Sequence, residues 1–365
     1  MAAPANRAGQ SRILGVLALT HSSRETNLDR CSAAFLEQRF GDPERLERLP
    51  PFESLQPAEA LYSGSVSFYR VALYAAGRHR FESIGDIKDR EKIQHVVLRD
   101  RDEMLIGYEH RVECWRLRRP VHVLSRITRS GCSIRARFEH PHLAGLHTVA
   151  PLSDDRVLLS CAGSDSVLVF DLGRSVIERS LRMPASLYGH NYTLTPEMDL
   201  RRHYIHDGCQ TTHLNAASVD REGRRAVVST LIQGAIGLFD LRTGDYEEIA
   251  RGFVGCHGAR FSDRDEIYLA DSPRGCLVFL GPDGRVTRRF ETGSLWLHDV
   301  QQIHKSIYAF ALADANELRI YHIDSGTLLM RRRFSVIPFE DSAPAPDGAP
   351  DWLGNSTQAL SYTTL

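Results

Sequence analysis

The sequence predicts an all-β protein, a six-bladed β-propeller with a short helical N-terminal extension. Three observations carry this prediction. The middle of the chain repeats about every 40 residues, each repeat holds four short apolar stretches separated by turns, and 365 residues suffice for six such repeats. Four short strands in a repeat of this length are typical of a propeller blade, in which they form one small twisted sheet.

Five of the repeats open with a histidine. These residues are His95, His147, His213, His257 and His298, at successive spacings of 52, 66, 44 and 41 residues. An apolar strand follows each histidine, and two further apolar strands follow after polar turns. A last turn, such as 281–284 (GPDG), leads to a fourth strand, such as 286–290. Each repeat therefore predicts one complete blade.

A sixth blade is expected upstream of these five. Residues 61–74 (LYSGSVSFYRVALY) match the second and third strands of a blade, and counting back places Pro50 or Pro51 where the other blades have histidine. Residues 27–40 predict a short helix with Asn27 as its N-cap. The expected domains are an N-terminal extension over 1–48, a propeller over 49–338 and a tail over 339–365, with a linker at 340–351. Seven blades result if 13–19 and the tail form another.

The 66-residue spacing implies an insertion of about 25 residues between two blades, which 189–212 fits. It enters on the side where the histidines begin, so we expect it to cover the channel mouth as a lid or substrate wall. Tyr192 and Asp207 are its candidates for a catalytic acid or base, and His190 is a candidate for an additional ligand. For each, the alternative is a solvated loop residue.

The histidines themselves predict a metal site. Equivalent positions on the innermost strands of a propeller surround the channel mouth, and neutral imidazole binds iron and zinc. The predicted ligands are His147, His213, His257 and His298, with His95 as the fifth candidate. Four histidines favour Fe(II) and oxygenase chemistry over zinc, which would give lyase or hydrolase chemistry. Structural histidines and a metal-free binding mouth are the alternatives.

The composition of the chain restricts the classes of binding partner that we expect. Lys and Arg number 45 against 46 Asp and Glu, so a net charge of −1 favours neither nucleic acid nor an acidic membrane surface. No apolar run approaches the roughly 18 residues of a membrane span, and no signal peptide is recognisable. The seven cysteines form no CxxC pair and predict reduced thiols in a cytoplasmic protein. The expected partner is a small organic molecule or a modified peptide as substrate.

Residues 257–290 resemble the repeat of NHL and gluconolactonase-type propellers, through the segments YLADS, LVF and PDGRV. A looser similarity covers 95–334. The resemblance implies either an interaction module or an enzyme. The histidine ring is similar to those of two metal-dependent propeller enzymes, the carotenoid-cleavage oxygenases and the peptidyl-hydroxyglycine lyase domain, and four histidines suit the iron enzymes better. Residues 169–172 (VFDL) and 238–241 (LFDL) resemble WD repeats, whose histidine is structural. An NHL or WD-type interaction propeller is therefore the competing expectation.

Overall fold

The structure is a computed structural model, and it describes residues 12–24, 62–73, 78–89, 93–121, 123–124, 126–153, 155–190, 194–200, 210–334 and 355–364. Within these residues every extended segment is a β-strand, and helix is confined to single turns. They are the α-helix α2 (Ala185–Tyr188) and the 3-10 helices η3 (Arg129–Gly131) and η5 (Ser272–Arg274). No helix in this part of the chain has the length and apolar character needed to cross a membrane.

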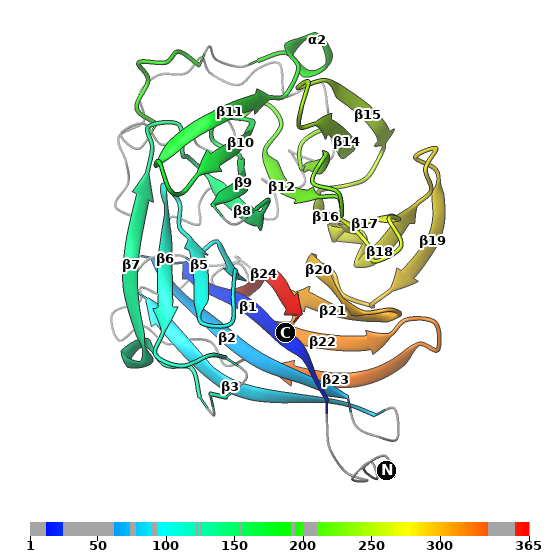
Figure 1. Ribbon diagram of the computed structural model, residues 1–365. Helices are drawn as coiled ribbons and strands as arrows, with labels where there is room; N and C mark the ends of the chain where they lie inside the picture. The colour runs from blue at the N-terminus through cyan, green and yellow to red at the C-terminus, as the bar shows by residue number, and fades with distance from the viewer. Residues whose placement is uncertain are drawn as a thin grey trace, which may run out of the picture.

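Six four-stranded antiparallel sheets surround a common axis, as predicted (Figure 1). The first blade contains β24 (Asn355–Thr364), β1 (Arg12–Arg24), β2 (Tyr62–Leu73) and β3 (His79–Asp89). The second contains β4 (His95–Leu98), β5 (Glu103–Gly107), β6 (Arg111–Leu117) and β7 (Cys132–Glu139). The third contains β8 (Leu146–Pro151), β9 (Arg156–Cys161), β10 (Ser166–Asp171) and β11 (Val176–Arg182).

The remaining three blades follow the same order from the axis outward. The fourth contains β12 (Leu214–Val219), β13 (Arg225–Thr230), β14 (Ala235–Asp240) and β15 (Tyr246–Arg251). The fifth contains β16 (Cys256–Phe261), β17 (Ile267–Asp271), β18 (Cys276–Leu280) and β19 (Val286–Glu291). The sixth contains β20 (Leu297–His304), β21 (Ile307–Leu312), β22 (Glu317–His322) and β23 (Thr327–Arg333). The first strand of each sheet contacts the first strands of the neighbouring sheets, so these six strands line the axis.

The first blade joins the two ends of the chain. The C-terminal strand β24 is its innermost strand and pairs with β1, for instance at Leu19 and Leu360 (Figure 1). The Thr20 hydroxyl accepts a hydrogen bond from the Ala359 amide at 2.9 Å. Parts of the predicted extension and tail therefore belong to the propeller, and they complete a sixth blade instead of adding a seventh. The predicted linker at 340–351 and helix at 27–40 lie outside the described residues.

The sequence matched 61–74 to two strands, but the described part of this segment, 62–73, is one long strand. This strand, β2, pairs along its length with β1 on one side and β3 on the other. The sequence pattern could not separate these cases, because a continuous apolar run fits one long buried strand as well as two short ones.

In the described residues the core contains six large apolar clusters, one between each pair of adjacent blades, and a small seventh cluster around Ala144 and Leu200. Strands in the middle of a blade are covered on both faces, which is why β21 reads IYAFAL and every one of its residues is buried. Outermost strands are covered on one face only, and β19 is mostly exposed. The five cysteines in the described part are free thiols, as expected.

Irregular pairing near the start of the inner strands shapes the channel mouth. The register between the first and second strands shifts around His147, Asn215 and His298, each of which is the extra residue of a β-bulge. A bulge redirects the side chain of its extra residue relative to regular pairing. The mouth is therefore lined by residues that the strand pattern alone would place differently.

Candidate functional site: the channel mouth

The five predicted histidines do not share one structural position. His147 and His257 both stand two residues after a glycine with positive φ, Gly145 and Gly255. In the fourth blade the residue with positive φ (48°) is His213 itself. Its carbonyl accepts the Leu231 amide, as the Gly145 carbonyl accepts the Ala162 amide. His213 is therefore the counterpart of the glycines.

The residue that corresponds to His147 in the fourth blade is Asn215, at the bulge of β12. Asn215 is buried, its side-chain amide donates to the Cys256 carbonyl at 2.8 Å, and its oxygen accepts the Ser229 hydroxyl at 2.7 Å. His95 differs again, because it begins a strand without a bulge. The sequence alignment on histidine was thus wrong by two residues in the fourth blade, and the structure does not contain a five-histidine ring.

The histidines form two pairs instead. The ring centroids of His147 and His213 are 4.9 Å apart in an edge-on arrangement, and those of His257 and His298 are 4.6 Å apart. The indole of Trp296 lies 6.0 Å from the His257 ring. A positive charge on His147 would lower the pKa of His257, so the two pairs also interact electrostatically. Four imidazoles and one indole therefore gather where the third to sixth blades meet the axis.

Hydrogen bonds select one tautomer of His257. Its Nδ1 lies 2.8 Å from the Gly255 carbonyl and 2.8 Å from the Ser272 hydroxyl. Since a carbonyl only accepts, Nδ1 carries the proton and Nε2 has the free electron pair. Burial lowers the pKa of His257 to about 4, so the ring is neutral at pH 7. The same bond, from His147 Nδ1 to the Gly145 carbonyl at 2.8 Å, orients the second imidazole.

Three aspartates hold the loops that carry these histidines. Asp165 accepts the Thr211 and Thr212 amides at 2.7 and 2.9 Å, directly before His213. Asp271 accepts the Val254 amide at 3.1 Å, before His257. Asp314 accepts the Leu295 amide at 2.8 Å, before His298. Each aspartate lies in or beside the hairpin between the second and third strands of its blade. The mouth is therefore held in place independently of any ligand.

These aspartates were missed in the sequence although a signal was present. The segments GSDS, LADSPRG and LADAN all follow the second strand of a repeat and contain one aspartate, at 165, 271 and 314. Short carboxylates at a repeated turn position are suited to binding backbone amides.

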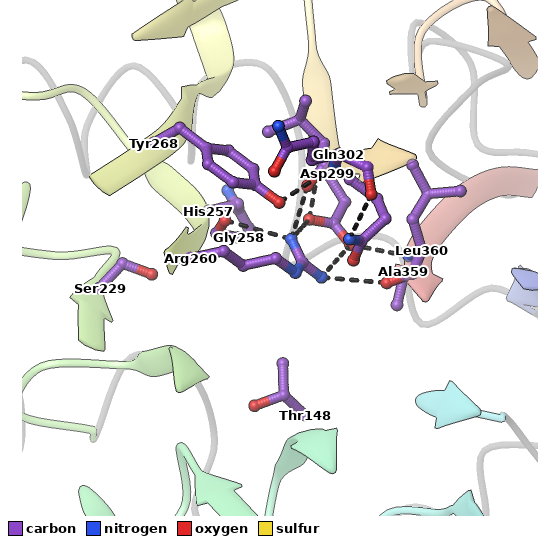
Figure 2. Close-up of polar contacts among 12 residues, drawn as sticks. Thr148, Ser229, His257, Gly258, Arg260, Tyr268, Asp299, Gln302, Ala359 and Leu360 are labelled. Atoms are coloured by element: carbon purple, nitrogen blue, oxygen red, sulfur yellow. Dashed lines mark hydrogen bonds and ion pairs between the residues drawn. The ribbon is translucent and has the colours of Figure 1, made fainter. Parts of the chain in front are cut away.

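A charged network, which we call the closure, ties the inner strands of the fifth and sixth blades to β24 (Figure 2). The Arg260 guanidinium binds both oxygens of Asp299, at 2.5 Å from Nη1 and 3.0 Å from Nη2, and both side chains are almost fully buried. Arg260 also donates to the Leu360 carbonyl at 3.0 Å, and Asp299 accepts the Leu360 amide at 2.7 Å. The pair therefore connects the fifth and sixth blades to the C-terminal strand. The Asp299 side chain therefore lies between blades.

Gly258 permits this contact. Its φ is +60°, and a Cβ atom there would lie 2.1 Å from Oδ1 of Asp299. Any other residue would displace the carboxylate from the guanidinium. His95 stands close enough for the Arg260 charge to act on it. Burial first, and that charge second, lower the pKa of His95 to about 4.

The predicted metal centre does not fit this arrangement. An iron or zinc site needs about three protein ligands that converge on one point. Among the residues that the structure describes, no group of three or more His, Cys, Asp or Glu side chains could hold a metal ion. The donor set of His147, His213, His257, His298 and His95 therefore does not support an Fe(II) or zinc site. The physical reason is the register, because the His213 and His95 backbones do not occupy the position shared by the other three.

The predicted insertion, 189–212, is described at 189–190, 194–200 and 210–212. Tyr192 and Asp207, the candidates for acid and base, lie outside the described residues. His190 Nε2 donates to the Met183 carbonyl at 2.6 Å, which gives this ring a structural partner. The end of the insertion, at Thr211 and Thr212, is buried against Asp165 beside the mouth.

Comparison with known proteins assigns no function to this chain. No protein family matches the sequence, and no curated protein does either. Among solved structures, streptogramin B lyase matches with a TM-score of 0.48 and 10% identity, over 82% of this chain and 90% of that one. Virginiamycin B lyase from Staphylococcus aureus matches with a TM-score of 0.46 and 10% identity, over 75% and 82%. The WD40 propeller domain of Doa1 gives 0.45 and 10%, over 70% and 74%.

The chain is a six-bladed propeller by its own strand order. The likeness to these solved structures assigns no reaction. The chemistry has to come from the side chains at the mouth.

Proposed function

We propose that the channel mouth is the active site of an enzyme that moves a proton on a small organic molecule or a modified peptide. The observation that carries the proposal is the state of His257, a buried neutral imidazole whose Nδ1 is bound to the Gly255 carbonyl at 2.8 Å. Its Nε2 is the atom that accepts the substrate proton. An oriented base with one defined tautomer is what general base catalysis requires.

The residues around His257 support binding of an organic substrate. Trp296 lies at 6.0 Å, and Leu295 beside it exposes 74% of its surface, the largest value among the exposed large apolar residues in the described part. Together they offer apolar contact at the mouth. His298, at 4.6 Å from His257, is the group that returns a proton to the product.

The low pKa of His257 restricts the reaction class. A base with a pKa of about 4 is unprotonated at neutral pH but removes only a relatively acidic proton. We therefore expect the proton to be activated by the substrate itself, as on a carbon next to a carbonyl group. Elimination and isomerisation are the reactions that begin in this way, and elimination makes the enzyme a lyase.

The test is a search for conversion with matched variants. Purified protein is incubated with the small-molecule and peptide fractions of a cell extract, and mass spectrometry records which masses disappear and which appear. His257→Gln removes the base. His322→Gln is the control, because the ring of this half-buried histidine lies within hydrogen-bond distance of the Ser325 hydroxyl on the sixth blade, away from the mouth.

The expected result is a conversion by the wild type and His322→Gln that His257→Gln lacks and that a metal chelator leaves unchanged. Equal conversion by His257→Gln would overturn the proposal. Conversion that is lost in chelator and restored by iron or zinc would overturn the direct role of imidazole. If the wild type converts nothing in either fraction, the propeller is an interaction platform instead.

A further inference from the structure

The connection between β6 and β7, residues 118–131, differs from its counterparts in other blades. The equivalent connections at 172–175 and 323–326 are turns of four residues. The longer connection contains η3, and its two ends meet where the Arg118 amide donates to the Gly131 carbonyl at 3.0 Å. We call residues 118–131 the arginine loop.

The arginine loop is anchored to two blades. Val121 and Ile127 are buried in the core between the first and second blades. The Ile127 amide donates to the Ile84 carbonyl at 2.5 Å, and the Val121 amide donates to the Arg101 carbonyl at 2.6 Å. A Cβ atom at Gly85 would lie 2.1 Å from the Ile127 carbonyl oxygen, so a glycine is needed there. These contacts hold Val121 and Ile127 in place before any ligand arrives, which lowers the entropic cost of binding.

A cavity of about 210 Å³ lies within this loop. Its apolar wall includes Leu117, Leu124 and Ile127. For comparison, a closed apolar cavity of about 150 Å³ holds benzene. The cavity is therefore large enough for a small ring or short alkyl group with one substituent, and too small for a folded peptide segment.

Arginines surround the cavity. Between Glu113 and Glu139 the sequence has seven arginines and neither aspartate nor glutamate, although the whole chain has a net charge of −1. Three of the seven pair with carboxylates outside the loop. The three that line the cavity, Arg118, Arg119 and Arg126, form no ion pair with any carboxylate of the described residues. They are exposed, so their charge is available to a ligand.

The remaining polar groups of the cavity do not oppose an anion. Cys132 donates its thiol hydrogen to the Thr128 carbonyl at 3.2 Å. Burial raises the pKa of this thiol to about 11, so it carries no negative charge at neutral pH. Arg129 stacks on the Trp115 ring at 3.7 Å and covers the base of the loop.

We infer that the arginine loop binds a small molecule that joins an apolar group to a tetrahedral oxyanion, as in an aryl or short alkyl monoester of phosphate or sulfate. Guanidinium groups match the oxygens of such an anion with paired N–H donors. Leu124, which is half-buried and lines the cavity, offers contact to the apolar group. The loop belongs to the first and second blades, whereas the histidine pairs belong to the third to sixth, so this site is separate from the channel mouth.

Titration calorimetry on the full chain tests this inference, with phenyl phosphate as the probe. Phenyl sulfate, inorganic phosphate and phenol are the comparison ligands. Arg118→Gln and Arg126→Gln each remove one guanidinium from the cavity. Arg285→Gln is the matched control, because Arg285 lies in the turn between β18 and β19 and its side chain is 87% exposed. Melting temperatures confirm that all variants are folded.

We expect phenyl phosphate and phenyl sulfate to bind the wild type, Arg285→Gln and His257→Gln alike. Each cavity variant should bind about tenfold more weakly or worse. Affinity should fall as salt rises, and phenol should not bind. No binding by the wild type, equal binding by Arg118→Gln and Arg126→Gln, or inorganic phosphate binding as tightly as phenyl phosphate would each overturn the inference.

Discussion

The channel mouth and the closure solve the same physical problem in opposite ways. His257 and Arg260 are three residues apart on β16, and His298 and Asp299 are adjacent on β20. In each case the histidine lies at the mouth, and the charged residue belongs to the closure. Burial of a titratable group costs free energy unless the group is neutral or paired. His257 is neutral, whereas Arg260 keeps its charge because Asp299 binds it at two positions.

Because of this difference, we expect the closure to matter mainly for stability and the mouth mainly for function. A buried ion pair that is complete adds little net stability, but losing one partner is costly. A neutral imidazole with a defined acceptor atom is less important to the fold and available to a substrate. The two regions should therefore respond differently to mutation and to pH.

The largest expected effect is on the closure. Asp299→Ala leaves Arg260 buried without its partner and removes the acceptor of the Leu360 amide. We expect a loss of about 3–5 kcal/mol in the free energy of unfolding, measured by denaturant titration. The double variant Arg260→Met, Asp299→Leu should recover part of this loss, because no charge is then left unpaired. If Asp299→Ala lowers the free energy of unfolding by less than about 1 kcal/mol, the Arg260–Asp299 pair is not important for stability.

Acid should destabilise the protein through histidines that are buried in the neutral state. Burial lowers the pKa of His21 to about 3 and those of His95 and His257 to about 4, against 6.5 when exposed. Below pH 6.5 the unfolded chain therefore binds more protons than the folded one, and stability falls as the pH is lowered toward 4. Each histidine accounts for about 3 kcal/mol over the full range.

Denaturant titrations at several pH values between 7 and 4 measure this slope. Carboxylates also titrate toward pH 4, so His257→Gln is the control for the histidine share. This variant should have a shallower slope between pH 6.5 and 4 than the wild type. An identical slope in the two proteins would mean that His257 is protonated normally.

Activity should depend on His257 much more than stability does. We expect His257→Gln to lower the rate of conversion by at least about 100-fold, which is the usual contribution of a general base. The loss in unfolding free energy at pH 7 should stay near 1 kcal/mol, since the amide of glutamine retains a donor for the Gly255 carbonyl. His322→Gln should change neither quantity. If His257→Gln loses as much unfolding free energy as Asp299→Ala, the mouth and the closure do not differ in their importance for stability.

How far the sequence anticipated this molecule depends on the kind of signal. The 40-residue repeats predicted the six blades, because strand length, turns and apolar pattern are local properties of each repeat. The sequence raised a blade built from 13–19 and the tail only as a possible seventh. It did not show that these segments complete the sixth, because the pairing between Leu19 and Leu360 joins opposite ends of the chain.

The arrangement of the candidate site could not be read from the spacing of the histidines. The bulges at His147, Asn215 and His298 shift the side chains by amounts that no spacing reveals. The Arg260–Asp299 pair depends on contacts between three blades, and one of them is completed by the closing strand.

The smallest expected effect concerns the second partner of His257 Nδ1. Ser272→Ala removes a hydroxyl at 2.8 Å but leaves the Gly255 carbonyl as acceptor. The free energy of unfolding should fall by about 1 kcal/mol, and conversion should continue within a few-fold of the wild-type rate. A loss of activity as large as in His257→Gln would assign the orientation of the ring to Ser272 instead.

The most direct test of the account is the protonation state of His257 in solution. Nitrogen NMR of protein labelled at histidine, with the His257→Gln variant to assign the signal, reports both ring nitrogens across a pH titration. The account predicts a proton on Nδ1, none on Nε2 at pH 7, and titration near pH 4. A ring that titrates near 6.5, or that carries its proton on Nε2, would contradict the proposal that the mouth offers a neutral, oriented base.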